Sequence, residues 1–114
     1  MPIDFPRLLA AVPLSTGTTT VYTVPASTRT QVTSIEVIEG ASAPEVFSLW
    51  RNNESAPNIL ADSAPIVAGG FVKWNRTSED PDYLYLNDPG DTIEGRKSGA
   101  GSALVIVRGT EVAI

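Results

Sequence analysis

The residues with the clearest capacity for chemistry are the carboxylates of the stretch EDPDYLYLNDPGD. Hard oxygen ligands of this kind can bind Ca²⁺, although their spacing matches no EF-hand loop. Asp, Asn, Pro and Gly are also the residues that tight turns need for their own backbone geometry. We therefore expect turns here, with a calcium site as the alternative, at Glu79, Asp80, Asp82, Asp88 and Asp91.

Large aromatic residues form the second candidate group. Trp50 and Trp74, with the nearby Tyr83 and Tyr85, could line a carbohydrate-binding surface. In a domain of this size, however, large aromatics mostly fill the core or anchor an interface with another chain. We favour the second interpretation and place Trp50 and Trp74 among the predicted partner-interface residues.

The composition removes most classes of enzyme. The chain has no Cys and no His, so it lacks the Ser-His and Cys-His catalytic arrangements and the usual ligands of zinc or copper. The Gly-rich segment GRKSGAGS lacks the Gly-Lys-Ser/Thr ending of a phosphate-binding loop and precedes a strand. We predict a protein that is not an enzyme, with no catalytic residue, no cofactor and no bound metal.

The charge and the N-terminal segment bear on partners. A net charge of -5 has the wrong sign for neutralising phosphates, so we expect no direct binding to nucleic acid. The N-terminal segment MPIDFPRLLAAVPLSTG is broken by prolines and carries Asp4, which fits neither a signal peptide nor a membrane span. We predict a protein that is made in the cytoplasm and contacts no membrane.

We expect residues 1–18 to be an extended N-terminal arm in which PRLLAA forms at most one or two helical turns before Pro13. The arm is predicted to pack on a neighbouring chain instead of its own domain. Deletion of residues 1–12 should then leave a folded domain that no longer incorporates into an assembly. The predicted contact residues are Ile3, Phe5, Leu8 and Leu9.

The remaining residues, 19–114, read as strands. Alternation of apolar and polar residues and regularly spaced turns predict an all-β chain with a single β-sandwich, either jelly-roll or immunoglobulin-like. The last strand has apolar residues on both faces, which is typical of a central strand. The predicted strands are Thr19–Val24, Thr30–Glu39, Val46–Arg51, Ile59–Ala61, Ile66–Val67, Phe71–Trp74, Tyr83–Leu86, Thr92–Glu94 and Ala103–Ala113, with a turn at Ala26–Arg29.

Two stretches carry a resemblance to a known group of proteins. TTVYTVPASTRTQVTSIEVIEG resembles the start of small β-sandwich virion proteins of tailed bacteriophages, and YLYLNDPGDTIEGRKSGAGSALVIVRGTEV is similar to their ending. The resemblance covers Val21 to Val112 in outline. Proteins of this kind include capsid decoration (cement) proteins and neck, tail and fibre modules. The loop EGASAPE departs from the Asn-Thr-Ser type of turn that relatives often have.

The resemblance implies a structural protein located in the virion, most simply a decoration protein that binds neighbouring subunits of the major capsid protein or another virion protein. Self-association is expected, with a homotrimer suited to the three-fold positions of a capsid lattice. Two alternatives remain open. One is a neck, tail or fibre component; the other is a carbohydrate-binding module for host recognition, which requires aromatic side chains in a solvent-open groove.

Overall fold

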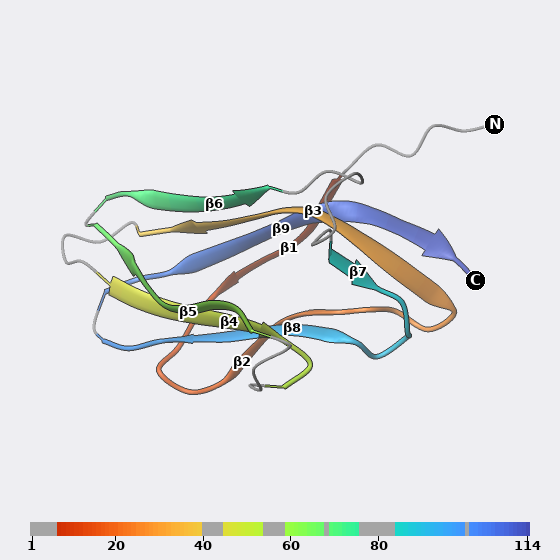
Figure 1. The fold of residues 1–114 in the computed structure, drawn as a ribbon, viewed down its shortest axis with the longest axis horizontal. Helices are drawn as coiled ribbons and strands as arrows, with labels where there is room; N and C mark the ends of the chain where they lie inside the picture. Colours follow the sequence, from red (N-terminus) through yellow and green to blue (C-terminus); the bar gives the residue numbers. More distant parts are fainter. Residues whose placement is uncertain (1–6, 40–44, 54–58, 68, 76–83, 100) are drawn as a thin grey trace.

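The structure is a computed structural model, and it describes residues 7–39, 45–53, 59–67, 69–75, 84–99 and 101–114 (Figure 1). These residues form strands and turns, and among them there is no helix that could cross a membrane. The strands are β1 (Arg7–Pro13), β2 (Thr19–Thr23), β3 (Thr28–Ile38), β4 (Glu45–Arg51), β5 (Ile59–Ile66), β6 (Phe71–Asn75), β7 (Leu84–Leu86), β8 (Thr92–Lys97) and β9 (Leu104–Ala113).

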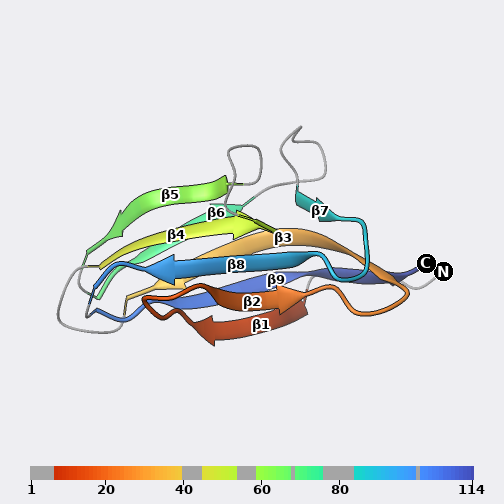
Figure 2. The same ribbon diagram turned by 90° about the horizontal axis from the view of Figure 1, so that it is seen from below.

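The strands make two antiparallel sheets that pack face to face, so the predicted β-sandwich is confirmed (Figures 1 and 2). Sheet A has the order β1-β9-β3-β6, with β7 also paired to β3, and sheet B has the order β2-β8-β4-β5. The first two strands lie in different sheets, whereas an immunoglobulin fold begins with two strands of one sheet. The nested pairing of β1 with β9 and of β2 with β8 is the strand order of a jelly roll.

The first strand corrects the prediction of an arm over residues 1–18. Residues 7–13 form β1, an edge strand that pairs with β9 from Arg7 opposite Gly109 to Pro13 opposite Leu104. The predicted helical turn is therefore wrong, and the sandwich begins at Arg7 and not at residue 19. The segment becomes a strand because Leu9, Ala10 and Val12 pack against the core, which gives it tertiary contacts that local propensity does not reveal. Deleting residues 1–12 would remove most of this strand.

Alternation along β3 and β9 builds the core. Ile35 and Val37 face sheet B and are each 2% exposed, whereas Glu36 between them faces outward. The prediction that β9 is central is also confirmed, because it lies between β1 and β3. One row of facing residues crosses all of sheet A on the core side, namely Val12, Val105, Val37 and Val72.

Three of the predicted strands differ from the structure by more than one residue at an end. β8 continues to Lys97, through residues that were predicted to begin a loop. The reason is Gly95, which lets β8 lie close to β4. A Cβ on Gly95 would be 2.7 Å from the carbonyl oxygen of Ser48. β5 is one strand and not two short ones, with irregular pairing where Ser63 has a positive φ of 50° and donates its N–H to Ser48 Oγ. β3 begins at Thr28, two residues earlier than predicted.

A chain of hydrogen-bonded side chains joins the two sheets. The Tyr22 hydroxyl on β2 donates to Glu111 Oε2 on β9 over 2.5 Å and lies 2.7 Å from Thr30 Oγ1 on β3. Glu111 also pairs with Arg7 on β1. Burial, and next the hydrogen bond to Glu111, raise the pKa of Tyr22 to about 12. The folded chain therefore favours the protonated phenol.

We expect this phenol to make the fold sensitive to alkali. Its ordinary pKa is 10.0, so stability is fully present below pH 10 and is lost, by about 2 kcal/mol, as pH rises towards about 12. Tyr22→Phe should lower the free energy of unfolding by about 1–2 kcal/mol at neutral pH and remove this alkaline component. Urea unfolding of both proteins between neutral pH and about pH 11 measures the difference. Identical alkaline slopes would contradict the assignment.

Candidate interaction surfaces

The outer face of sheet A carries an apolar row that crosses four strands. Directly opposite residues of antiparallel strands point to the same side of a sheet. Pro13 faces Leu104, Leu104 faces Ile38, and Ile38 faces Phe71, all on the side away from the core. Phe71 is 64% exposed, and Leu104 and Ile38 are half-buried. Large apolar side chains gathered in this way are typical of a surface that contacts another molecule.

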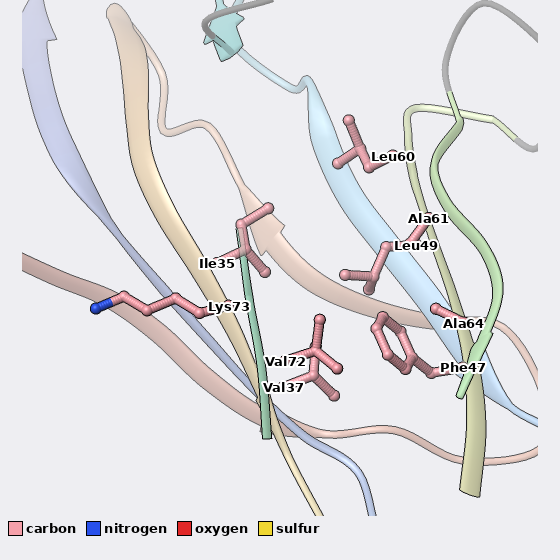
Figure 3. Close-up of a pocket in the computed structure, with 9 residues that line it drawn as sticks. All are labelled: Ile35, Val37, Phe47, Leu49, Leu60, Ala61, Ala64, Val72 and Lys73. Atoms are coloured by element: carbon pink, nitrogen blue, oxygen red, sulfur yellow. The ribbon is translucent and has the colours of Figure 1, made fainter. Parts of the chain in front are cut away.

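The two sheets are open to each other along the side formed by β5 and β6. There a cavity of about 190 Å³ reaches in among core side chains (Figure 3). Eight of its nine lining residues are apolar, and the remaining one, Lys73, directs its ammonium away from the others (Figure 3). The cavity is lined by Ile35, Val37, Phe47, Leu49, Leu60, Ala61, Ala64, Val72 and Lys73.

The strands beside this cavity are the edges of their sheets. β6 ends the order of sheet A and β5 ends that of sheet B, so among the described strands each has a neighbour on one side only. β6 directs Val72 towards the cavity, whereas Phe71 and Lys73 face outward. Val67, in the turn that joins the two strands, is 72% exposed. Unpaired edges with apolar side chains can pair with a further strand.

A more polar hollow of about 400 Å³ lies at the other end of β3, around Tyr85. Tyr85 is 41% exposed, and its hydroxyl accepts a hydrogen bond of 3.1 Å from Gln31 Nε2. Arg29 and Asn87 line the same hollow. An exposed ring beside amide and guanidinium groups is an arrangement that can stack on and hydrogen-bond to a sugar.

The described part of the acidic stretch behaves as a turn. Asp91 Oδ2 accepts the N–H of Asp88, the Asp91 N–H donates back to the Asp88 carbonyl, and Gly90 has a positive φ of 91°. Asp91 Oδ1 also accepts a bond from Asn52. The turn prediction is confirmed for Asp88 and Asp91. Glu79, Asp80, Asp82 and Tyr83 lie outside the described residues, and within the described ones no group of three metal-binding side chains occurs.

Two buried glutamates, which the sequence analysis did not single out, hold the loop before β9. Glu45 Oε1 accepts the N–H groups of Val46, Ser98 and Gly99 and the Ser98 hydroxyl, at 2.9 to 3.2 Å. Glu39 Oε1 accepts the N–H and hydroxyl of Ser102. Burial alone would raise the pKa of Glu45, but these donated bonds outweigh it and hold the pKa below its ordinary value. Glu45 therefore anchors Ser98 and Gly99, and Glu39 anchors Ser102.

Three of the predicted interface residues, Trp50, Leu8 and Leu9, have side chains that the structure describes. Trp50 is 2% exposed, with its ring under the Arg96 guanidinium at 5.2 Å and its N–H donated to Glu94, so the prediction that Trp50 is a partner-interface residue is wrong, and so is an exposed sugar-binding role. Leu8 is 57% exposed, and Leu9 packs against the core. Trp74 lies in β6 opposite Ile35, and its side chain is outside the described parts, as are Ile3 and Phe5.

The surface residues that sequence reasoning missed are those of the outer row and the β5–β6 side. Their signal was present in β9, where Leu104 and Ile106 alternate with Val105 and Val107. Apolar residues on both faces of β9 predict a central strand. They also indicate that the outer face of its sheet has apolar surface that another molecule can cover. Neither a protein-family model nor a curated protein matches this sequence.

Proposed function

We propose that this chain is a non-enzymatic structural protein of a tailed-phage virion and acts as a capsid decoration protein that binds neighbouring capsid subunits. The observation that carries the proposal is the apolar row Pro13, Leu104, Ile38 and Phe71 on the outer face of sheet A. The resemblance of the β2–β3 and β7–β9 stretches to virion proteins supplies the context. A neck, tail or fibre position would use the same kind of contact.

The physics of such a role is the burial of surface. A sandwich of this size offers on the order of 800 Å² to a partner, and apolar burial contributes about 25 cal/mol per Å² before the costs of association. The row ends in the exposed Phe71, and the charged residues Glu36 and Lys73 lie beside its Ile38–Phe71 end on one side. Many symmetry-related copies on one particle would add avidity to a modest single contact.

Binding to heads of the encoding phage, prepared without this chain, tests the proposal. Phe71→Ser should weaken binding at least about tenfold, because a large exposed apolar side chain is lost from the contact. Tyr85→Ser, at an exposed aromatic outside the row, is the matched control and should bind as the unchanged protein does. Saturated heads should also resist heat better than bare heads. Equal binding by the Phe71 variant, or no binding to any virion part, would overturn the proposal.

A carbohydrate-binding role is the second candidate, because the hollow at Tyr85 combines an exposed ring with Gln31 and Asn87. The same two variants separate the candidates. Glycan binding that disappears in Tyr85→Ser and persists in Phe71→Ser favours this second role. Binding to heads with the opposite pattern favours decoration.

A further inference from the structure

We propose that the open side between β5 and β6 is a receptor for the N-terminal segment of a second copy of this chain, residues 1–6, which adds to β6 as an antiparallel strand. This inference deepens the self-association included in the proposed function by naming the segment and the groove. It concerns copies in solution, so it can fail while binding to a virion holds.

The cavity has a size and an apolar lining that suit one aromatic ring. At about 190 Å³, with apolar residues from four strands around it, it is comparable to an apolar cavity of about 150 Å³ that holds one benzene molecule. The segment MPIDFP offers one aromatic ring, that of Phe5. A single phenyl group would therefore fill the opening that Figure 3 shows among Val72, Leu60 and Phe47.

The side chains of β6 and of the added segment alternate in a matching way. Along β6, Val72 faces the cavity and the exposed Lys73 faces the outer side of sheet A. In an added strand, Phe5 and Asp4 would also point to opposite sides. Antiparallel pairing that places Phe5 opposite Val72 places Asp4 opposite Lys73, and opposite charges in facing positions stabilise a strand pair. Asp4 is the one acidic side chain of residues 1–6, and Lys73 is the one charged side chain that lines the cavity.

The distance from β1 to the edge of β6 requires that the added segment comes from a second copy. β1 and β6 are three strand spacings apart in sheet A, roughly 14 Å. Arg7 pairs with Gly109, whereas Lys73 lies in the row of Ile106, a further offset of roughly 10 Å along the strands. The resulting separation between the backbones of Arg7 and Lys73 is roughly 17 Å, and a chain of three residues spans at most about 10 Å, so the backbone of Asp4 cannot lie beside Lys73 of its own chain as a paired strand.

A segment that leaves one copy and enters the next makes a head-to-tail contact. Contacts of this kind close into rings when the rotation between copies allows it, which is compatible with the expected trimer. Main-chain hydrogen bonds to the β6 edge provide affinity, and the cavity provides specificity for the aromatic side chain, as in other cases of strand addition.

Cysteine cross-linking tests the geometry directly, because the chain contains no cysteine of its own. The variants Asp4→Cys and Lys73→Cys leave Phe5 and the apolar lining unchanged, and mixing them under oxidising conditions should give a disulfide-linked pair of one copy of each. Asp4→Cys mixed with Arg108→Cys is the matched control, since Arg108 is exposed on the same outer face of sheet A. Cross-linking no greater than in this control overturns the proposal. A chain that carries both Asp4→Cys and Lys73→Cys should form no disulfide within itself, and such a disulfide would also overturn the proposal.

Association measured by analytical ultracentrifugation gives a second, independent readout. Phe5→Ser should weaken self-association about 10-fold to 100-fold, since the buried ring is lost. Asp4→Lys and Lys73→Asp should each weaken it, and the two changes in one chain should restore it, because the charges are again opposite. Additive weakening in the double variant, or an unchanged association constant in Phe5→Ser, overturns the proposal. Loss of self-association with retained head binding would separate this inference from the proposed function.

Discussion

Replacement of Gly109 by alanine should lower the free energy of unfolding by at least about 3 kcal/mol, or prevent folding altogether. Gly109 lies in β9 between β1 and β3, where it faces Arg7 on one side and Val32 on the other. A Cβ at this position would stand 2.2 Å from the carbonyl oxygen of Gln31 and 3.0 Å from Cα of Val32. The obstacle is backbone, so it cannot move aside as a flexible side chain can.

The pairing of β3 with β9 explains why the backbones approach so closely here. The register shifts between Val32 and Ser34, next to the residue that faces Gly109, and such a bulge bends one strand towards its neighbour. Gly17→Ala is the matched control, since the nearest atom to its Cβ would be Ser15 Oγ at 3.9 Å. Chemical unfolding followed by tryptophan fluorescence measures both variants. A Gly109→Ala protein within about 1 kcal/mol of the unchanged chain would mean that the two strands do not approach as described.

The same strands show which parts of the fold could be predicted from the sequence. β3 and β9 have enough apolar residues at the period of a strand to be predicted as long strands, and the alternation in β3 also indicates its buried face. Ile35 and Val37 alternate with Glu36 in the sequence, and in the structure the first two are buried on the core face while Glu36 faces outward. Local pattern is sufficient when a strand is long and one of its faces is uniformly apolar.

β1 could not be predicted in the same way. The segment RLLAAVP has no clear alternation, and it is a strand because β9, about a hundred residues later, provides its hydrogen-bonding partner. Non-local pairing of this kind leaves no mark within a short window of sequence. The extension of β8 through Gly95 has a similar cause, since the glycine read as part of a loop is required by the closeness of β4.

The candidate surface was harder to predict than the fold. The sequence directed attention to tryptophans, yet Trp50 is covered by its own chain, through Arg96 and Glu94. The exposed apolar residues are instead Phe71, Val67 and others whose exposure depends on where their strand lies in the sheet. β6 is an edge strand only because of the order of sheet A, and strand order is a property of the whole chain.

The second large effect is expected for Glu45→Ala, which should lower the free energy of unfolding by about 3–5 kcal/mol. Glu45 Oε1 is the acceptor for the N–H groups of Val46, Ser98 and Gly99, so its removal takes this acceptor from Val46 and Gly99, whereas the Ser98 N–H keeps its bond to the Val46 carbonyl. Because Gly99 and the Ser98 hydroxyl belong to the β8–β9 loop, the change also removes one anchor of this loop, while Glu39 still holds Ser102. Glu36→Ala, on the outward face of β3, is the matched control and should change stability by less than about 1 kcal/mol.

The pH dependence separates the charge of Glu45 from its shape. Since the folded pKa is held below the ordinary value of 4.5, the stabilisation by the carboxylate is present above that value and is lost as pH falls through the folded pKa. Glu45→Gln keeps an acceptor oxygen but has no charge, so it should be less stable at neutral pH and lose less stability on acidification. Among the described residues, Glu45 Oε2 is buried without a hydrogen-bond partner. In the glutamine variant, the amide atom at that position would also lack a hydrogen-bond partner. Equal acid slopes in the two proteins would assign the stabilisation to packing instead of charge, because packing does not titrate.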